Sequence, residues 1–268
     1  MKVGNRRNIV KVGITGAAGI IGKVITEGLS DSFDLTLFYH HTEIKNQNLK
    51  KAKIDLSRVE EIKGAFEGLD AVIHLAGASH PRFSWESILN KNIVATYNVF
   101  EEAHRAGVSK VVYASSNHVQ YGGIMLGPPS PLYLLSPFYK KHRGYVRIND
   151  AVTPDSYYAV SKLFGENLGW YYSRMHNIQC VVLRIGDISE QDDRSSEKGT
   201  DREDYVRAMF LSRRDCIEAF RRALQIDTEY LVAYAISDND RRVFDMKETM
   251  EKLGTNPQDN LEDYFTEA

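Results

Sequence analysis

The stretch from Val10 to Gly22, which reads VKVGITGAAGIIG, constrains the fold of this chain more than any other. An apolar, β-favouring run ends at Thr15, and an apolar segment with helical spacing occupies 20–29. The turn between them contains Gly16, Gly19 and Gly22. Strand, glycine turn and helix in this order are typical of a dinucleotide fingerprint, because glycines permit a sharp turn and let a pyrophosphate approach the helix N-terminus. The stretch therefore predicts a nucleotide site; a glycine-rich turn without a ligand is the alternative.

Strand-like and helical segments alternate along the rest of the chain. The strand-like runs are 10–15, 35–38, 71–75, 110–114, 179–185 and 231–236, and helical spacing occurs over 20–29, 59–66, 84–106 and 157–175. This alternation predicts a Rossmann fold, a doubly wound parallel α/β sheet with helices on both faces. We expect one domain over 1–268 with a small C-terminal substrate-binding part. The segments near 121–156 and 188–268 are the expected substrate-binding regions, because they follow strand ends.

Composition narrows the class of protein. Apolar residues make up 43% of the chain, which is enough for a sizeable core, and the formal net charge is −2. This balance gives no reason to expect nucleic acid or an anionic membrane as a partner. No apolar run approaches the ~20 residues of a membrane span, and Cys180 and Cys216 lack metal-ligand spacing. A cytoplasmic protein without a structural metal is expected.

The residues after the second predicted strand bear on the choice of cofactor. Many NAD-binding folds place an acidic residue there to hold the ribose hydroxyls. This chain has His40 and His41 there instead, and the first acidic residue after the predicted strand is Glu43. Because an acid would repel the 2′-phosphate of NADP, its absence favours NADP slightly, with NAD as the alternative. Further along, Asp55 and Leu56 are candidates to meet the adenine, although Asp55 is equally suited to be a helix N-cap.

Two motifs point to catalysis. Ser115 and Ser116 end the fourth predicted strand, and Tyr158 and Lys162 lie at positions i and i+4, which is one face of a helix. A nearby ammonium favours the phenolate of a tyrosine. A serine hydroxyl is then able to hold an alcohol oxygen while the tyrosine takes its proton. Alone, the Tyr/Lys pair is compatible with an exposed helix face; together with the glycine loop it indicates a dehydrogenase.

These motifs resemble the extended short-chain dehydrogenase/reductase superfamily, part of the NAD-dependent epimerase/dehydratase group, along nearly the whole chain. The resemblance implies that Tyr158 is the base, that Lys162 binds ribose and tyrosine, that Ser116 orients the reacting oxygen, and that Asn92 serves a proton relay. It implies a homodimer as well. The expected cofactor contacts are Gly16, Gly19, Ile20, Ile21, Gly22, His40, His41, Asp55, Leu56, Leu75, Ala76, Gly77, Asn92, Tyr158 and Lys162.

A narrower resemblance is to the uronate dehydrogenases and to the short-chain type of archaeal glucose-6-phosphate dehydrogenase. It implies oxidation of the C1 hydroxyl of an anionic hexose to a lactone, with glucose 6-phosphate favoured and a uronate next. The implied sugar contacts are Ser79, Ser116, Asn117, His118, Tyr158 and Arg184. Arg184 would face the anion; a strand-end ion pair is its alternative role, and a satisfied loop histidine is that of His118.

Two features leave the substrate open. A basic segment over 139–147 contains Lys140, Lys141, His142, Arg143 and Arg147, and it suits either a sugar anion or solvent. A nucleotide-sugar 4-epimerase or dehydratase is the rival function, because it uses the same scaffold. A non-catalytic nucleotide-binding protein is a second rival, although such relatives commonly lose the Tyr/Lys pair that this chain keeps.

Overall fold

A single parallel sheet organises the computed structural model, which describes residues 9–45, 48–79, 83–125 and 145–265. Its seven strands lie in the order β3-β2-β1-β4-β5-β6-β7. They are β1 (Lys11–Thr15), β2 (Asp34–Tyr39), β3 (Lys50–Lys53), β4 (Ala71–His74), β5 (Lys110–Ser116), β6 (Gln179–Ile185) and β7 (Tyr230–Ala235). All residues of β4 and β5 are buried, as expected of strands covered on both faces. The predicted doubly wound parallel α/β fold is confirmed.

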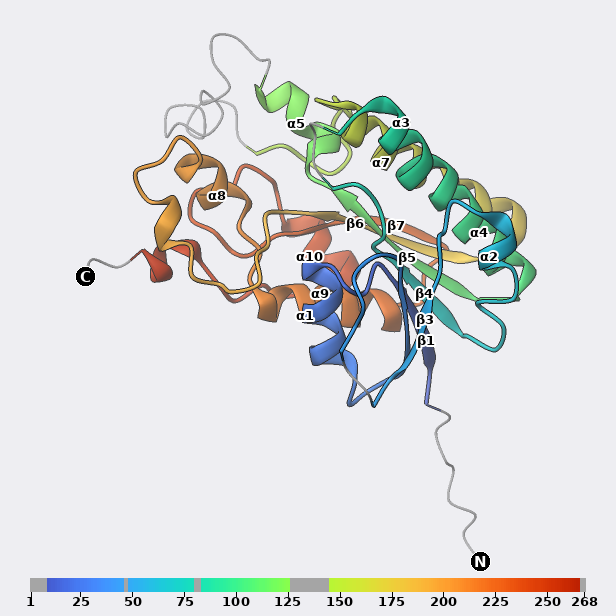
Figure 1. Cartoon of the computed structure of the whole chain (residues 1–268). Helices are drawn as coiled ribbons and strands as arrows, with labels where there is room; N and C mark the ends of the chain where they lie inside the picture. Colours follow the sequence, from blue (N-terminus) through green and yellow to red (C-terminus); the bar gives the residue numbers. More distant parts are fainter. Residues whose placement is uncertain (1–8, 46–47, 80–82, 126–144, 266–268) are drawn as a thin grey trace, which may run out of the picture.

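Helices cover both faces of the sheet (Figure 1). On one face α1 (Ile20–Leu29) packs against α9 (Arg213–Gln225), with α10 (Lys247–Leu253) beside β7. On the other face α7 (Tyr157–His176) packs on β5 and β6 and against α4 (Ala95–Arg105). The remaining helical elements are α2 (Val59–Ile62), α3 (Trp85–Ile88), η1 (Leu89–Val94), α5 (His118–Met125), η3 (Ser195–Glu197), α8 (Glu203–Met209) and η4 (Leu261–Tyr264). The two largest apolar cores lie between the sheet and these two layers.

Several elements differ from the sequence-based expectation. The helix expected over 84–106 is α3, a π-helical turn η1, and α4 in succession. The sequence analysis missed β3, because the edge strand KKAK lacks an apolar run; charged residues on an edge strand also discourage pairing with other chains. It also missed α9 and α10, and it treated the regions that hold α5 and α8 as loops.

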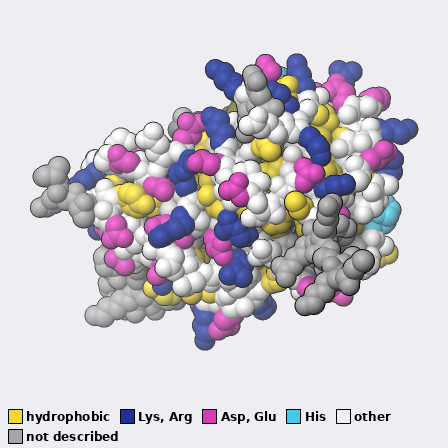
Figure 2. Space-filling model, turned by 90° about the horizontal axis from the view of Figure 1, so that it is seen from below, with side chains coloured by type: hydrophobic (Ala, Val, Ile, Leu, Met, Phe, Trp, Pro, Cys, Tyr) yellow, Lys and Arg dark blue, Asp and Glu magenta, His cyan; other side chains and the backbone are white. Residues whose placement is uncertain are grey.

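The C-terminal region contributes to the main sheet as well as to the site. Strand β7 and helices α9 and α10 complete the sheet and its cover, while α8 packs through Val206 and Phe210 on Leu261 and Phe265 near the C-terminus. Figure 2 shows one face of the molecule, on which basic and acidic side chains alternate without a continuous patch of one sign. Among the described residues, none of the helices is both long and apolar enough to span a bilayer.

The sheet positions the site through its strand order. The order reverses direction between β1 and β4, which are neighbours although β2 and β3 follow β1 in the chain. In open parallel sheets ligands bind beyond the carboxyl ends of the strands at this point. Gly16 starts the turn there with a φ of +71°, and a Cβ at this position would lie 2.7 Å from the backbone nitrogen of Ala76. Only glycine permits that conformation and that close approach.

Candidate active site

A cavity of about 700 Å³ lies along the carboxyl edge of the sheet, lined by residues that follow β1, β2, β4, β5 and β6. The structure brings together there nearly all of the residues that the sequence predicts for cofactor and substrate. They are Gly16, Gly19, Ile20, Ile21, Gly22, His40, His41, Asp55, Leu56, Leu75, Ala76, Gly77, Ser79, Ser116, Asn117, His118, Tyr158 and Lys162. Two predicted residues, Asn92 and Arg184, are not among the residues that line this cavity.

The glycine loop forms a cradle that side chains would fill. Gly19 is the N-cap of α1 and no side chain caps the helix, so its first N–H groups face the cavity. A Cβ on Gly22 would lie 2.5 Å from the carbonyl oxygen of Ala17, so the absence of a side chain at Gly22 lets the helix start this close to its strand. Unpaired N–H groups and the positive end of a helix are suited to a pyrophosphate. The residues present therefore fit a dinucleotide.

The end of the cavity beyond β2 is lined by imidazoles. The rings of His40 and His41 lie 3.7 Å apart between centroids, and Nε2 of His40 is 3.7 Å from Oδ2 of Asp55. The Oδ1 atom of Asp55 accepts hydrogen bonds from the backbone N–H and the hydroxyl of Ser57. Burial opposes ionisation of Asp55, but these hydrogen bonds hold its pKa below the usual value. The N-cap role considered for Asp55 is wrong, because Arg58 occupies that position of α2.

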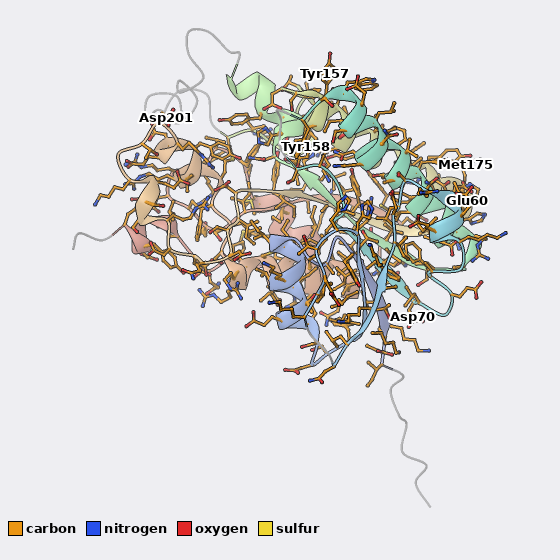
Figure 3. All side chains as sticks on the ribbon, in the orientation of Figure 1. Glu60, Asp70, Tyr157, Tyr158, Met175 and Asp201 are labelled. Carbon is orange, nitrogen blue, oxygen red and sulfur yellow. The ribbon has the colours of Figure 1, made fainter. Side chains whose placement is uncertain are left out.

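The predicted catalytic residues lie where β5 ends against the start of α7. Ser156 caps α7, which sets Tyr158 in its first turn and Lys162 one turn later. Nζ of Lys162 donates to the carbonyl oxygen of Ala114 at 2.8 Å and lies 5.8 Å from the centroid of the Tyr158 ring. Tyr158 points inward, whereas Tyr157 lies at the outer surface (Figure 3). The spacing of the Tyr/Lys pair thus places both groups on the cavity side of the helix.

Burial moves the pKa values of these two groups in opposite directions. It lowers the pKa of Lys162 to about 8. It raises the pKa of Tyr158, while the hydrogen bond with Ser116 acts against that rise. Both shifts favour the neutral form, but with a pKa of about 8 Lys162 still carries its charge in most molecules at neutral pH, whereas Tyr158 stays a neutral phenol. A bound group that brings positive charge would favour the phenolate.

Asn92 lies in the π-helical turn η1, behind the cavity wall. Its Oδ1 accepts a hydrogen bond from the backbone N–H of Ala78 at 2.7 Å, and its Nδ2 donates to the carbonyl oxygen of Ala78 and to Oγ of Ser161 at 2.8 Å. Ser161 in turn donates to the carbonyl oxygen of Tyr158. Asn92 therefore ties the loop after β4 to the catalytic helix. Its role in a proton relay stays a prediction.

The rings of His118 and Tyr205 lie next to Tyr158 at the end of the cavity away from His40, and we call these three residues the aromatic cluster. Nδ1 of His118 is 2.6 Å from Oδ2 of Asp155, and its Nε2 is 3.5 Å from the hydroxyl of Tyr205. The Tyr205 hydroxyl also accepts a hydrogen bond from Asn117, and burial raises its pKa to about 12. Neither Asp155 nor Tyr205 was predicted: Asp155 lies three residues before Tyr158 but its contact with His118 is long-range, and Tyr205 is close to the site only in space. The hydroxyls, amide and imidazole there suit a ligand with several hydroxyl groups.

The structure corrects the prediction for Arg184. This side chain forms a bidentate ion pair with Glu166 on α7, with Nε–Oε1 at 3.0 Å and Nη2–Oε2 at 2.8 Å, and both residues are 4% exposed. Its third nitrogen donates to the carbonyl oxygen of Ile148. Arg184 is thus the strand-end ion pair that was its alternative role, and it does not face a sugar anion.

The remaining basic candidates belong to the segment 139–147, and the structure describes only part of this segment. Lys140, Lys141, His142 and Arg143 lie outside the described residues. Arg147 is described; it is exposed and is not among the residues that line the cavity. Within the described part of the chain, no group of three or more His, Cys, Asp or Glu residues is arranged to hold a metal ion.

An acidic residue that the sequence analysis did not single out lies at the same end. Asp187 follows β6 and lines the cavity. Its carboxylate forms an ion pair with Arg194, and its Oδ1 is 3.4 Å from Nη2 of Arg202. The guanidinium of Arg202 also lies 5.9 Å from the centroid of the Tyr205 ring. Asp187 therefore joins the aromatic cluster through Arg202.

The fold and the site together define a Rossmann-type dinucleotide-binding protein with the side chains of a dehydrogenase. The NAD dependent epimerase/dehydratase family matches residues 12–189, and the chain belongs to this family.

Relatives share nearly the whole chain. It is 37% identical to an L-arabinose 1-dehydrogenase (NAD(P)(+)) of Haloferax volcanii, over 94% of this chain and 98% of that protein. It is 32% identical to an NAD-dependent glucose-6-phosphate dehydrogenase of the same organism, over 95% of each. Among solved structures, uronate dehydrogenase from Agrobacterium tumefaciens is 25% identical with a TM-score of 0.76, over 96% of this chain and 87% of that one.

Proposed function

We propose that this protein oxidises the C1 hydroxyl of a monosaccharide to a lactone with NAD or NADP. The observation that carries the proposal is the meeting of Ser116, Tyr158 and Lys162 between two parts of one cavity. One part is the glycine cradle, which fits a dinucleotide, and the other is the cluster around His118 and Tyr205, which fits a polyhydroxylated ligand. The reaction needs both ligands next to a proton acceptor.

The side chains divide the work in this reaction. Ser116 holds the oxygen of the C1 hydroxyl, and Tyr158 takes its proton. Lys162, fixed by the carbonyl oxygen of Ala114, stabilises the phenolate when it is charged. Nicotinamide, when bound, accepts the hydride from C1. His118, held by Asp155, and Asn117 orient the other hydroxyls of the sugar.

The activities by which the relatives are named support this class of reaction. One relative acts as an L-arabinose 1-dehydrogenase, another as a glucose-6-phosphate dehydrogenase, and a third is a uronate dehydrogenase. A pentose, a sugar phosphate and a sugar acid are thus the substrates to compare. For the cofactor, His40 and His41 line the cavity where an acid would exclude NADP, which supports use of NADP beside NAD.

The expectation of an anionic sugar depended on Arg184 and on the basic segment, and the preference for glucose 6-phosphate over a uronate depended on the resemblance and on that segment. Arg184 no longer supports an anionic sugar, because its guanidinium is bound to Glu166. The substrate within the class therefore has to come from other residues of the site. The rival function, a nucleotide-sugar 4-epimerase or dehydratase, predicts no net reduction of the dinucleotide during turnover.

A spectrophotometric screen tests the proposal. Neutral aldoses, uronates and sugar phosphates are offered with NAD and with NADP, and the appearance of reduced cofactor is followed by absorbance. We expect net reduction with a free sugar and its loss in Tyr158→Phe, since phenylalanine keeps the ring and removes the proton acceptor. Tyr157→Phe is the matched control, because the neighbouring ring is 60% exposed and points away from the site (Figure 3). Full turnover in Tyr158→Phe would refute the assignment of the base.

We further propose that the protein is a cytoplasmic homodimer. Exposed apolar side chains on α4 and α7, namely Tyr97, Trp170, Tyr171 and Met175, support an association through this helical layer. Both cysteines are buried free thiols, which suits a reducing compartment. Light scattering after size-exclusion chromatography tests the dimer, and a monomer mass would refute it.

A further inference from the structure

We propose that Asp187 selects substrates by their charge, so that the enzyme prefers a neutral aldose to a sugar carrying a carboxylate or phosphate. This inference rests on the proposed function and names the substrate class within it. The carboxylate lines the cavity directly after β6, whose end lies beside Ser116 through the pairing of Ser116 with Ile185. Asp187 is thus a negative charge at the end of the cavity that holds the sugar.

The two arginines nearest to this end already have a carboxylate partner. Arg194 is buried, with 8% of its surface exposed, and it is ion-paired with Asp187. Arg202 contacts the same carboxylate at 3.4 Å and also lies 3.8 Å from Glu197. The arginine fork is the group that best recognises a substrate carboxylate or phosphate. Here Asp187 stands where such an anion would have to bind.

The backbone holds Asp187 in this position. Its N–H donates to the carbonyl oxygen of Met209 and its carbonyl oxygen accepts from the N–H of Leu211. The preceding Gly186 has no room for a side chain, because a Cβ there would lie 2.2 Å from the carbonyl oxygen of Met209. An anionic sugar would therefore meet a fixed carboxylate, and it would have to displace that carboxylate from a buried arginine to gain a partner of its own.

A neutral sugar meets no such penalty. Hydroxyl groups donate to carboxylate oxygens in charge-assisted hydrogen bonds. Asp187, whose Oδ2 is buried against Arg194, together with the polar atoms of Asn117, His118 and Tyr205 gives the sugar end acceptors and donors. The same end has one more carboxylate, Asp155, but it is already bound to His118. The balance of charges thus suits an uncharged polyol ring.

A lysine other than Lys162 lines the cavity, and its effect on substrate charge has to be separated from that of Asp187. Lys91 lies in η1, with its Nζ 5.9 Å from the centroid of the Phe83 ring. It is therefore included in the test as Lys91→Met. If Lys91 recognised a substrate anion, its removal would lower the efficiency on anionic sugars in particular.

The test uses matched sugars that differ only in the group at C6, which is neutral or anionic: glucose, glucuronate and glucose 6-phosphate, and galactose with galacturonate. For the wild-type enzyme we expect kcat/KM to be at least about tenfold higher on the neutral member of each set. Asp187→Asn keeps the size of the side chain and removes its charge, so it should raise the ratio of anionic to neutral efficiency at least about tenfold. Glu197→Gln is the control, because it also removes a carboxylate beside Arg202 but does not line the cavity; its ratio should stay that of the wild type.

The outcomes separate this inference from the proposed function. Net cofactor reduction with the anionic member preferred by the wild type would overturn the role of Asp187 and leave the dehydrogenase assignment intact. A loss of that preference in Lys91→Met would then identify the residue responsible. If no sugar tested supported reduction of the cofactor, both the proposed function and the role of Asp187 would be overturned. An anionic preference of the wild type overturns the role of Asp187 whether or not Asp187→Asn folds. An unchanged ratio in a folded Asp187→Asn overturns it as well, so the nucleotide affinity and melting temperature of this variant are measured alongside.

Discussion

Replacing Arg184 by methionine should destabilise the protein far more than it changes substrate recognition. The guanidinium makes two hydrogen bonds to Glu166 and one to the carbonyl oxygen of Ile148, all in the interior. Removing it leaves the carboxylate of Glu166 buried with the hydroxyl of Ser115 as its hydrogen-bond donor. Breaking a buried pair by removing one partner costs about 3–5 kcal/mol of unfolding free energy. For a chain of this size that corresponds to a fall in melting temperature of about 10 °C.

The assay combines urea denaturation with steady-state kinetics. The control is the double variant Arg184→Met/Glu166→Gln, which removes both charges and keeps an acceptor for Ser115; we expect it to recover most of the lost stability. The KM values of Arg184→Met for a neutral sugar and for its uronate should change in parallel. A stability loss below about 1 kcal/mol, together with a KM increase confined to the anionic sugar, would refute this reasoning. That result would restore the sequence-based role of Arg184.

Three further predictions follow from the cavity. The pKa of Lys162 is about 8 in the folded protein against an ordinary 10.5, so the unfolded chain binds more protons between these two pH values and stability should rise with pH there. Lys162→Met should flatten this rise in a series of denaturation measurements between pH 8 and 9.5. Identical slopes for the two proteins would contradict a lowered pKa of Lys162. His41→Asp should lower the affinity for NADP at least about tenfold and leave that for NAD in place; titration calorimetry checks this, and a wild type that binds NAD alone would reject it. Gly16→Ala should lower the melting temperature, because residue 16 has a φ of +71° and a Cβ there would clash with Ala76. Gly19→Ala should keep the fold and weaken nucleotide binding. Equal melting temperatures for the two variants would contradict the strain assigned to Gly16.

The sequence predicted well the strands that consist mostly of apolar residues. The predicted range 179–185 agrees with β6, and β1, β4 and β7 agree within one residue at each end, because strands buried on both faces are continuous apolar runs. Strand β3 and helix α9 were missed for the opposite reason. KKAK has no apolar run, and α9 is rich in charged residues around a narrow buried stripe. Packing on the sheet forms β3. Helix α9 does carry a local pattern, since Cys216, Ala219, Phe220 and Ala223 recur at helical spacing after the cap Ser212, and this signal was left unused.

The candidate site divides in the same way. The glycine cradle and the Tyr158/Lys162 pair were predictable, because their function depends on spacing within one element. Arg184 was misassigned because its partner Glu166 lies on another element, and no local pattern reports that contact. Asp187, directly after β6, and Tyr205, on α8, were missed because no sequence motif links either of them to the cavity that they line. The charges that select a substrate come from such long-range contacts, so they required the structure.

The transfer of hydrogen from C1 of the sugar is the most direct test of the proposed reaction. A neutral aldose labelled with deuterium at C1 is oxidised to completion, and the reduced dinucleotide and the sugar product are analysed by mass spectrometry. The account predicts that the deuterium is recovered in the dinucleotide and that the product is the unlabelled lactone or its hydrolysis product. Deuterium retained in the sugar, or transfer from a C4-labelled sugar instead, would contradict it and favour epimerase chemistry at this site.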